Sequence, residues 1–346
     1  MFDLEGFAGH ERIVHVHDPA SGLRAILAIH STALGPACGG CRLWTYASAS
    51  EAATDALRLA EGMSYKNALA EVPFGGGKAV ILGPIPDARR EAVLRAFGRA
   101  VHDQGGAYVT AEDVGMAPRD MEVIARETPY VSGLAAKDGR AGGDPSPYTA
   151  RGVRCGIEAA AKHALGRSDL EGLRVAVQGL GRVGGHLCRE LAERGAKLVV
   201  ADLDDARTTE ICDEHGAEPG PLETILLADV DLVAPCALGG VITLDVAERM
   251  QARIVAGAAN NQLASPEAGS RLHARGIAYA PDYLINAGGI IVVAGEYFGD
   301  AEPARIEAAV DRIGERTLDL FERARASGRP THEIALERAR ARIAAA

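Results

Sequence analysis

The stretch Leu173-Arg-Val-Ala-Val-Gln178-Gly179-Leu-Gly181-Arg-Val-Gly184 decides the fold. Its first half is an apolar run that predicts a buried strand over 173–178, and the spacing of apolar residues over 185–194 predicts a helix. A second predicted strand, 197–202, ends in Asp202. A Gly-x-Gly-x-x-Gly turn between a strand and a helix, followed by an acid at the end of the next strand, indicates a dinucleotide-binding unit.

The residues of this turn have defined roles toward a dinucleotide. The glycines permit the tight turn and let a pyrophosphate approach the N-terminus of the helix. Asp202 would accept the hydroxyls of the adenosine ribose and repel a 2′-phosphate, which favours NAD over NADP. A packing turn without a coenzyme is the alternative. The predicted cofactor-binding residues here are Gly179, Leu180, Gly181, Arg182, Val183, Gly184 and Asp202.

The rest of the chain predicts an α/β protein of two domains. Its 346 residues exceed the usual length of one domain. Further strands at 231–234 and 253–256 alternate with helical stretches, so the loops 235–240, 257–262 and 281–289 should share one edge of a doubly wound sheet. We expect an α/β substrate domain over 1–140, a Rossmann-type NAD-binding domain over 146–320, and a C-terminal helix over 321–346 that packs back on the N-terminal domain. The Gly/Pro-rich stretch 138–147 is the predicted linker.

A lysine dominates the chemistry of the first domain. It occurs in Val72-Pro-Phe-Gly-Gly-Gly-Lys78-Ala-Val-Ile-Leu, where three glycines let a ligand approach the backbone and the following apolar run predicts a buried strand. Burial lowers the pKa of a lysine amine, more so beside another cation such as Lys66, and a neutral amine can act as a base. The alternative is a surface turn with a solvated lysine.

Several local patterns surround this lysine. Residues 12–17 and 23–30 predict a hairpin, and the pair Gly39 and Gly40 is expected just after a strand, where backbone N–H groups could receive a carboxylate. Ser48 and Glu51 form the pattern of a capping box for a helix that should end close to Lys66.

Acidic residues mark the next two elements. Asp87 is expected to cap a helix running to about 104, and Glu112 and Asp113 follow a short predicted strand over 107–110. For Glu112 a helix-capping role is preferred over a ligand role, and for Asp113 both stay open.

Composition limits the partners. The formal net charge of -10 argues against nucleic acids and anionic membranes, which favours a small molecule. The acidic N-terminus lacks signal-peptide character and the six cysteines are widely spread, so we expect a cytoplasmic protein with reduced thiols. Cys38 and Cys41 lack a second pair, and the histidines lack ligand spacing, so no metal site is predicted.

Six motifs occur in an order that resembles the glutamate, leucine, phenylalanine and valine dehydrogenase family, and within it most closely the leucine dehydrogenases. They are Leu34-Gly-Pro-Ala-Cys-Gly-Gly-Cys-Arg, Phe74-Gly-Gly-Gly-Lys-Ala-Val-Ile, Thr110-Ala-Glu-Asp-Val-Gly, Val177-Gln-Gly-Leu-Gly-Arg-Val, Ala234-Pro-Cys-Ala-Leu-Gly-Gly and Ala280-Pro-Asp-Tyr-Leu-Ile-Asn-Ala-Gly-Gly. The resemblance implies reversible, NAD-dependent oxidative deamination of an L-amino acid to its 2-oxo acid and ammonia.

The resemblance also implies roles for individual residues. Lys66 would bind the substrate carboxylate with the backbone of Gly39 and Gly40, Lys78 would activate water, and Asp113 would exchange protons with the substrate amine. Asn261 would hold substrate and nicotinamide, and Thr149 and Cys236 would complete the cofactor site. The side-chain pocket would comprise Cys38, Ala111, Ile290 and Val293.

This pocket contains no evident cation, because Cys38 stands where glutamate dehydrogenases have a lysine. We therefore expect leucine, valine or isoleucine as substrate, and members of such families are commonly homo-oligomers. The alternatives are a phenylalanine or tryptophan dehydrogenase with the same chemistry, a catalytically silent NAD-binding regulator, and a lyase that uses NAD internally.

Overall fold

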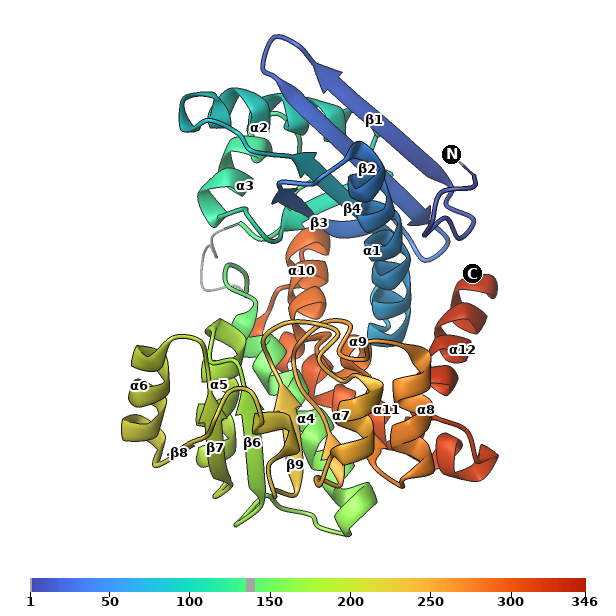
Figure 1. The fold of residues 1–346 in the computed structure, drawn as a ribbon. Helices are drawn as coiled ribbons and strands as arrows, with labels where there is room; N and C mark the ends of the chain where they lie inside the picture. The colour runs from blue at the N-terminus through green and yellow to red at the C-terminus, as the bar shows by residue number, and fades with distance from the viewer. Residues whose placement is uncertain (1, 135–140) are drawn as a thin grey trace. The chain divides into compact units, whose positions relative to one another are not determined.

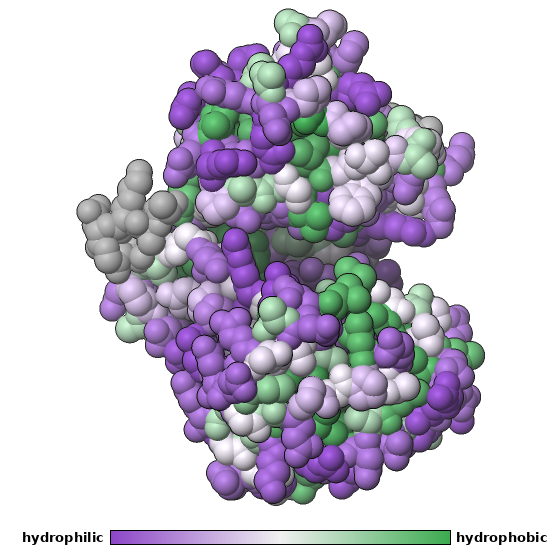
Figure 2. Space-filling model, turned by 60° about the vertical axis from the view of Figure 1, so that its left-hand side comes forward, coloured by the Kyte–Doolittle hydropathy of each residue, from purple (hydrophilic) through white to green (hydrophobic). Residues whose placement is uncertain are grey.

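The computed structural model describes residues 2–134 and 141–346, which form two compact units (Figure 1). The first unit comprises residues 1–144, 292–303 and 339–346, and the second comprises 145–291 and 304–338. Of the predicted linker over 138–147, residues 138–140 lie outside the described part of the chain. A search of the described residues found no helix with the length and apolarity needed to cross a bilayer. Hydrophilic residues cover most of the face seen in Figure 2, with smaller hydrophobic patches on both units.

The first unit contains a five-stranded mixed sheet with the order β1-β2-β4-β3-β5. β1 and β2 form the predicted antiparallel hairpin, β2 and β4 are antiparallel, and β3 is parallel to both β4 and β5. The elements of its N-terminal part are β1 (Arg12–Asp18), β2 (Leu23–Ser31), β3 (Ala37–Trp44), α1 (Ala49–Ala70), β4 (Gly75–Leu82), α2 (Asp87–His102), β5 (Tyr108–Glu112) and α3 (Pro118–Ala125).

Helices cover both faces of this sheet, and strand alternation decides which side chain meets which helix. In β4, Ala79 and Ile81 pack in the core that α2 and α3 complete, whereas Val80 packs with the alanine-rich face of α1. Because successive side chains of a strand point to opposite faces, Lys78 lies on the α1 face with Val80. The sequence thus directs the lysine toward α1.

The second unit contains a six-stranded parallel sheet with the order β11-β10-β9-β6-β7-β8. The chain runs from β6 to β7 and β8 on one side, then crosses to β9 on the other, so the strand order reverses at β6. This is the predicted doubly wound topology, and ligands bind at such reversal points.

Its elements are α4 (Ser146–Leu165), β6 (Arg174–Gln178), α5 (Arg182–Ala192), β7 (Lys197–Ala201), α6 (Asp205–His215), β8 (Glu218–Pro219), η1 (Ile225–Leu227), β9 (Leu232–Pro235), α7 (Leu244–Arg249), β10 (Ile254–Val255), α8 (Pro266–Ala274), β11 (Ala278–Tyr279) and α9 (Asp282–Ile285). The chain continues through α10 (Gly288–Phe298), α11 (Pro303–Ser327) and α12 (Thr331–Ala344). Residues 339–346, which include the end of α12, count with the first unit, where Arg340 donates to the hydroxyl of Tyr65 on α1.

Four local predictions were wrong in detail. Gly39 and Gly40 lie inside β3 rather than after a strand, because β4 and β5 pair with β3 on either side. α1 continues to Ala70, so Lys66 lies within the helix and not at its terminus. Asp87 is the first residue of α2 and makes no capping bond.

The fourth correction concerns Glu112. This residue ends β5, and the N-cap of α3 is Ala117, whose N–H donates to the Asp120 carboxylate. The capping interpretation of Glu112 is therefore wrong. By contrast, the predicted cap at Ser48 is confirmed, because its hydroxyl accepts from the N–H of Glu51. The Glu51 carboxylate accepts from the N–H of Ala47, one residue before the N-cap, so the second bond of the predicted capping box is displaced by one residue.

Candidate active site

A buried ion pair joins the two residues predicted to move protons. The Lys78 ammonium lies 2.6 Å from Oδ2 of Asp113, with side chains 7% and 23% exposed. Lys78 comes from the middle of β4, and Asp113 follows β5 directly. The surface-turn interpretation of Lys78 is wrong, because the residue lies in a buried strand. An amine and a carboxylate at this distance can pass a proton between them.

Two cations keep Asp113 ionised. Burial alone would raise the pKa of its carboxyl group, but Lys78, followed by Arg42 with its Nε 3.1 Å from Oδ2, holds the pKa below the usual value. The carboxylate is therefore present as an acceptor at neutral pH.

Glycines allow the chain to pack closely around the Lys78–Asp113 pair. A Cβ on Gly40 would lie 2.8 Å from the Asp113 Cβ, so a larger residue in β3 would displace the acid. A Cβ on Gly76 would lie 2.1 Å from the Ser64 nitrogen, so this glycine lets α1 approach β4. The Gly75–Gly77 run thus serves the close packing of the chain around Lys78.

The helical turn of α1 that carries Lys66 is fixed to β4 through the neighbouring residue, Asn67. The side chain of Asn67 donates to the carbonyl of Gly75 at the start of β4, at 2.6 Å. α1 is capped at its C-terminus by Glu71, which adopts a left-handed conformation with φ 59°. This end of α1 is fixed on the strand that carries Lys78, so both predicted lysines belong to adjoining elements of the same unit.

The residues predicted to form the side-chain pocket do not all belong to one unit. Cys38, Ala111 and Val293 belong to the first unit, and Ile290 belongs to the second. The Cys38 side chain is fully buried, and burial raises its pKa, so it behaves as a small apolar group. Val293 and Ile290 on α10 are also buried.

A carboxylate also lies near Cys38. Glu296 on α10 accepts from the N–H groups of Gly133 and Leu134 at 2.9 and 3.0 Å, and it acts on the Cys38 thiol electrostatically. Burial raises the Glu296 pKa even though these two N–H groups oppose the shift. Lys78 and, less strongly, Glu296 thus act on the Cys38 thiol with opposite signs.

The predicted dinucleotide turn has the geometry that its motif requires. Gly179 has φ +94°, and a Cβ on Gly184 would lie 2.0 Å from the Gly179 carbonyl oxygen, so both positions need glycine. A Cβ on Gly181, at the start of α5, would meet nothing within 4 Å, so this helix N-terminus has room for a phosphate group. The residues present therefore fit a dinucleotide.

The acid at the end of the next strand is in place. Asp202 accepts from the N–H of Leu180 at 2.6 Å and from the N–H of Asp204 at 2.9 Å. Burial would raise the Asp202 pKa, but these backbone donors hold it below the usual value. An ionised carboxylate thus lies beside the turn. Cys236 adjoins the start of the turn, because its N–H donates to the carbonyl of Gln178 at the end of β6.

Two further predicted residues lie in the same unit. Asn261 has a left-handed conformation with φ 53°, held by its N–H bond to Asp282 at 2.8 Å. Such a conformation in a non-glycine residue is a feature of ligand-binding loops. Thr149 lies in the first turn of α4, where its hydroxyl donates to the carbonyl of Pro145 and keeps its acceptor capacity.

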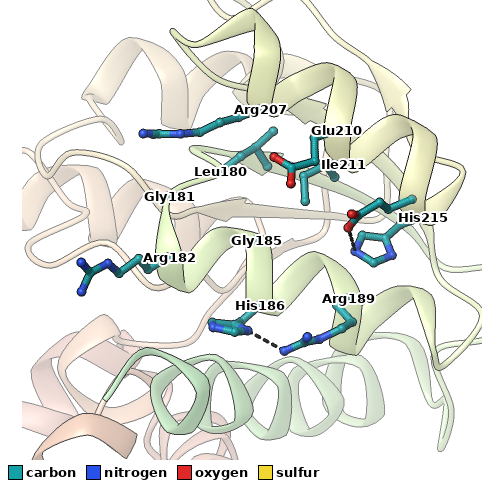
Figure 3. Close-up of a pocket in the computed structure, with 11 residues that line it drawn as sticks. Leu180, Gly181, Arg182, Gly185, His186, Arg189, Arg207, Glu210, Ile211 and His215 are labelled. Atoms are coloured by element: carbon teal, nitrogen blue, oxygen red, sulfur yellow. Dashed lines mark hydrogen bonds and ion pairs between the residues drawn. The ribbon is translucent and has the colours of Figure 1, made fainter. Parts of the chain in front are cut away.

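A groove of about 350 Å³ lies between α5 and α6 (Figure 3). Leu180, Gly181 and Arg182 of the dinucleotide turn form one end, and mostly polar side chains, such as His186 in contact with Arg189, line the rest together with Ile211. Lys66, Lys78 and Asp113 are not among its lining residues, so the groove does not include the Lys78–Asp113 ion pair.

Sequence reasoning missed the residues that hold Asp113. Arg42 contacts both Asp113 and Asp55, and the hydroxyl of Tyr46 donates to Asp55 at 2.6 Å. Arg42 ends one of the motifs quoted above, but no spacing rule relates it to an acid 71 positions away.

Comparisons with known proteins identify the family of the chain. A family model described as "Glu/Leu/Phe/Val dehydrogenase, dimerisation domain" matches residues 10–130, and one described as "Glutamate/Leucine/Phenylalanine/Valine dehydrogenase" matches 144–225 and 200–325. The chain is 46% identical to a leucine dehydrogenase of Geobacillus stearothermophilus, over 96% of this chain and 90% of the relative. It is 46% identical to a valine dehydrogenase of Streptomyces coelicolor, over 98% and 93%.

A solved structure is similar over the same extent. The L-tryptophan dehydrogenase from Nostoc punctiforme has a TM-score of 0.84 and 40% identity, covering 97% of this chain and 96% of that one. The predicted fold class and family are thereby confirmed. The chain belongs to the Glu/Leu/Phe/Val dehydrogenase family and is an amino acid dehydrogenase.

Proposed function

We propose that this enzyme oxidises leucine, valine or isoleucine with NAD, reversibly, to the 2-oxo acid and ammonia. The observation that carries the proposal is the buried contact of 2.6 Å between Lys78 and Asp113. Oxidative deamination needs one group that activates water and another that exchanges protons with the leaving amine. A lysine and an aspartate in contact provide both.

The chain's residues divide the work as follows. Lys66, with the backbone of Gly39 and Gly40, binds the substrate carboxylate. NAD, when bound, accepts the hydride from Cα. Lys78, in its neutral amine form, takes a proton from the water that attacks the substrate iminium carbon, and Asp113 transfers protons to and from the nitrogen that leaves as ammonia. Desolvation of this pair strengthens its electrostatic action on the developing charges.

An apolar substrate side chain suits the predicted pocket. Cys38, Ala111, Ile290 and Val293 offer apolar surface, and none of the four carries a cation that could pair with a second substrate carboxylate. Burying an unpaired carboxylate costs several kcal/mol, which disfavours glutamate. The similarity to leucine and valine dehydrogenases supports the same choice.

The coenzyme is NAD. Gly179 to Gly184 would hold the pyrophosphate, and Asp202 would accept the adenosine ribose hydroxyls, with Thr149, Cys236 and Asn261 completing the site. The ionised Asp202 would repel a 2′-phosphate.

A phenylalanine or tryptophan dehydrogenase is the second candidate. The similarity to a tryptophan dehydrogenase structure favours it, and Cys38 is a small residue that leaves room for a ring. Apolar pockets discriminate one methylene by only about 1–3 kcal/mol, so activity on both classes fits the same chemistry.

The assembly and location belong to the same proposal. We expect a homo-oligomer formed through the first unit, since the model that matches it is described as a dimerisation domain. All six cysteines are free thiols, which suits a reducing cytoplasm. Light scattering on the purified enzyme tests the first expectation.

Product stoichiometry tests the reaction. With leucine and NAD, equal amounts of NADH, ammonia and 2-oxo acid are expected. Ammonia without net NADH would instead support a lyase that uses NAD internally. NAD binding without any product would support the silent regulator.

A further inference from the structure

We infer that Arg42, clamped between Asp113 and Asp55, is a positioning residue that fixes the carboxylate of Asp113 for proton transfer. The inference rests on the proposed function, since it concerns how the acid of that reaction is held. It adds a chain of three residues, Arg42, Asp55 and Tyr46, behind the proton-transfer pair.

The geometry of the clamp is specific. Nε of Arg42 donates to Oδ2 of Asp113 at 3.1 Å, and its NH1 group donates to both carboxylate oxygens of Asp55, at 3.3 and 3.0 Å. Tyr46 then donates to Oδ2 of Asp55 at 2.6 Å. One guanidinium thus binds two acids through different nitrogens, which a lysine ammonium cannot do in the same fixed arrangement.

The clamp makes Oδ2 of Asp113 a shared acceptor. Lys78 and Arg42 both donate to this oxygen, from β4 and β3 respectively. Two donors from neighbouring strands define the direction of the carboxylate, although Asp113 lies in the segment after β5. Proton transfer requires a fixed geometry of the reacting groups. Loss of one donor should therefore lower kcat strongly and change the affinity for substrate little.

The clamp is only partly exposed. The side chains of Arg42 and Asp55 are 25% and 27% exposed, so water screens the interaction only in part. The charged and titratable groups that act on Asp113 or are acted on by it come from every neighbouring element: Lys78 on β4, Arg42 and Cys41 on β3, Tyr46 after β3, and Tyr108 on β5. Arg42 is the only member of this set, besides Lys78, that carries positive charge.

The clamp predicts that two substitutions shift the pH profile of kcat in opposite directions. Arg42→Gln removes a cation that favours the ionised Asp113, so the acidic limb of the pH profile of kcat should move to higher pH, by about one unit. Asp55→Asn removes the anion that offsets Arg42, so the limb should move to lower pH. A merely structural role would not produce shifts of opposite direction.

The experiment measures pH profiles of kcat, KM and NADH binding for Arg42→Gln, Arg42→Lys and Asp55→Asn. Arg42→Gln should lower kcat by about 10- to 100-fold while NADH affinity stays unchanged. Arg42→Lys keeps the charge, so its limb should stay near that of the wild type. The matched control is Arg58→Gln, because Arg58 lies on α1, is 58% exposed and pairs with the exposed Glu5.

Loss of kcat in Arg42→Gln with an unmoved limb would overturn the inference, and so would unchanged kcat. If Arg42→Gln fails to fold, Asp55→Asn decides: a limb at lower pH supports the clamp, and an unmoved limb contradicts it.

A second readout separates this inference from the proposed function. NMR of the ¹³C-labelled aspartate carboxyl groups, with Asp113 assigned by the Asp113→Asn variant, follows the titration of Asp113 in the resting enzyme. Arg42→Gln should raise the Asp113 pKa whether or not the enzyme deaminates an amino acid. Absence of turnover in the wild type would therefore refute the function alone, and an unshifted Asp113 titration would refute the clamp alone.

Discussion

Replacing Lys78 with methionine should abolish turnover and leave the fold and coenzyme binding intact. Methionine has nearly the length of lysine and no charge, so the change creates no cavity in β4 but removes the 2.6 Å contact with Asp113. Orphaning a buried charge usually costs about 3–5 kcal/mol of stability. Asp113 keeps Arg42 at 3.1 Å, so the expected cost here is smaller, about 1–2 kcal/mol. Loss of a general base lowers turnover by about 100- to 10,000-fold.

The assay for this variant combines NADH formation with leucine, NADH fluorescence for binding, and chemical denaturation for stability. Lys162→Met is the control, because Lys162 is an exposed lysine on α4. A folded Lys78→Met enzyme that deaminates leucine within about tenfold of the wild-type rate would remove Lys78 from the mechanism.

Three further predictions concern the coenzyme, the packing and the pH. Asp202→Ala should lower kcat/KM for NAD by about tenfold and narrow the preference over NADP, and an unchanged ratio of the two would refute the ribose assignment. Gly76→Ala should destabilise the protein by about 2 kcal/mol or more in chemical denaturation, because its Cβ would lie 2.1 Å from the Ser64 nitrogen, whereas exposed Gly62→Ala should be neutral or stabilising. Asp120→Asn should lower the free energy of unfolding by about 1–3 kcal/mol at neutral pH. Burial alone would raise the Asp120 pKa, but its arginine partner on α2 holds that pKa below the usual value. The stability difference between wild type and variant should therefore be complete above the pKa of Asp120 in the unfolded chain and disappear as the pH falls through its lower pKa in the folded protein. Stability curves of the two proteins that stay parallel down to strong acid would contradict this prediction.

The dinucleotide turn shows what a sequence pattern can predict. The strand, the glycines and Asp202 are close in sequence, and each glycine answers a local requirement, such as φ +94° at Gly179. The pattern therefore predicted both the topology and the position of the acid. The same holds for the N-cap of α1, where Ser48 accepts from the N–H of Glu51, three positions on.

Long-range pairing accounts for the errors in the first unit. Gly39 and Gly40 look like turn residues, yet β3 is flanked by β4 and β5, and small residues there allow close approach of Gly77 and Asp113. The role of Arg42 depends on contacts with α1 and the segment after β5, which no local pattern contains. Lys78 and Asp113 could be identified from the sequence because each lies within a motif of its own. Their contact became evident only from the fold.

The central claim is that a buried lysine and aspartate move the protons in the NAD-dependent oxidative deamination of an apolar amino acid. The most direct test is the rate of NADH formation by the wild-type enzyme with leucine, valine, isoleucine, phenylalanine, tryptophan and glutamate at alkaline pH. The account predicts the highest kcat/KM on the branched aliphatic substrates, lower values on the aromatic ones and almost none on glutamate. Glutamate as the preferred substrate, or no NADH with any of the six while NAD still binds, would contradict it.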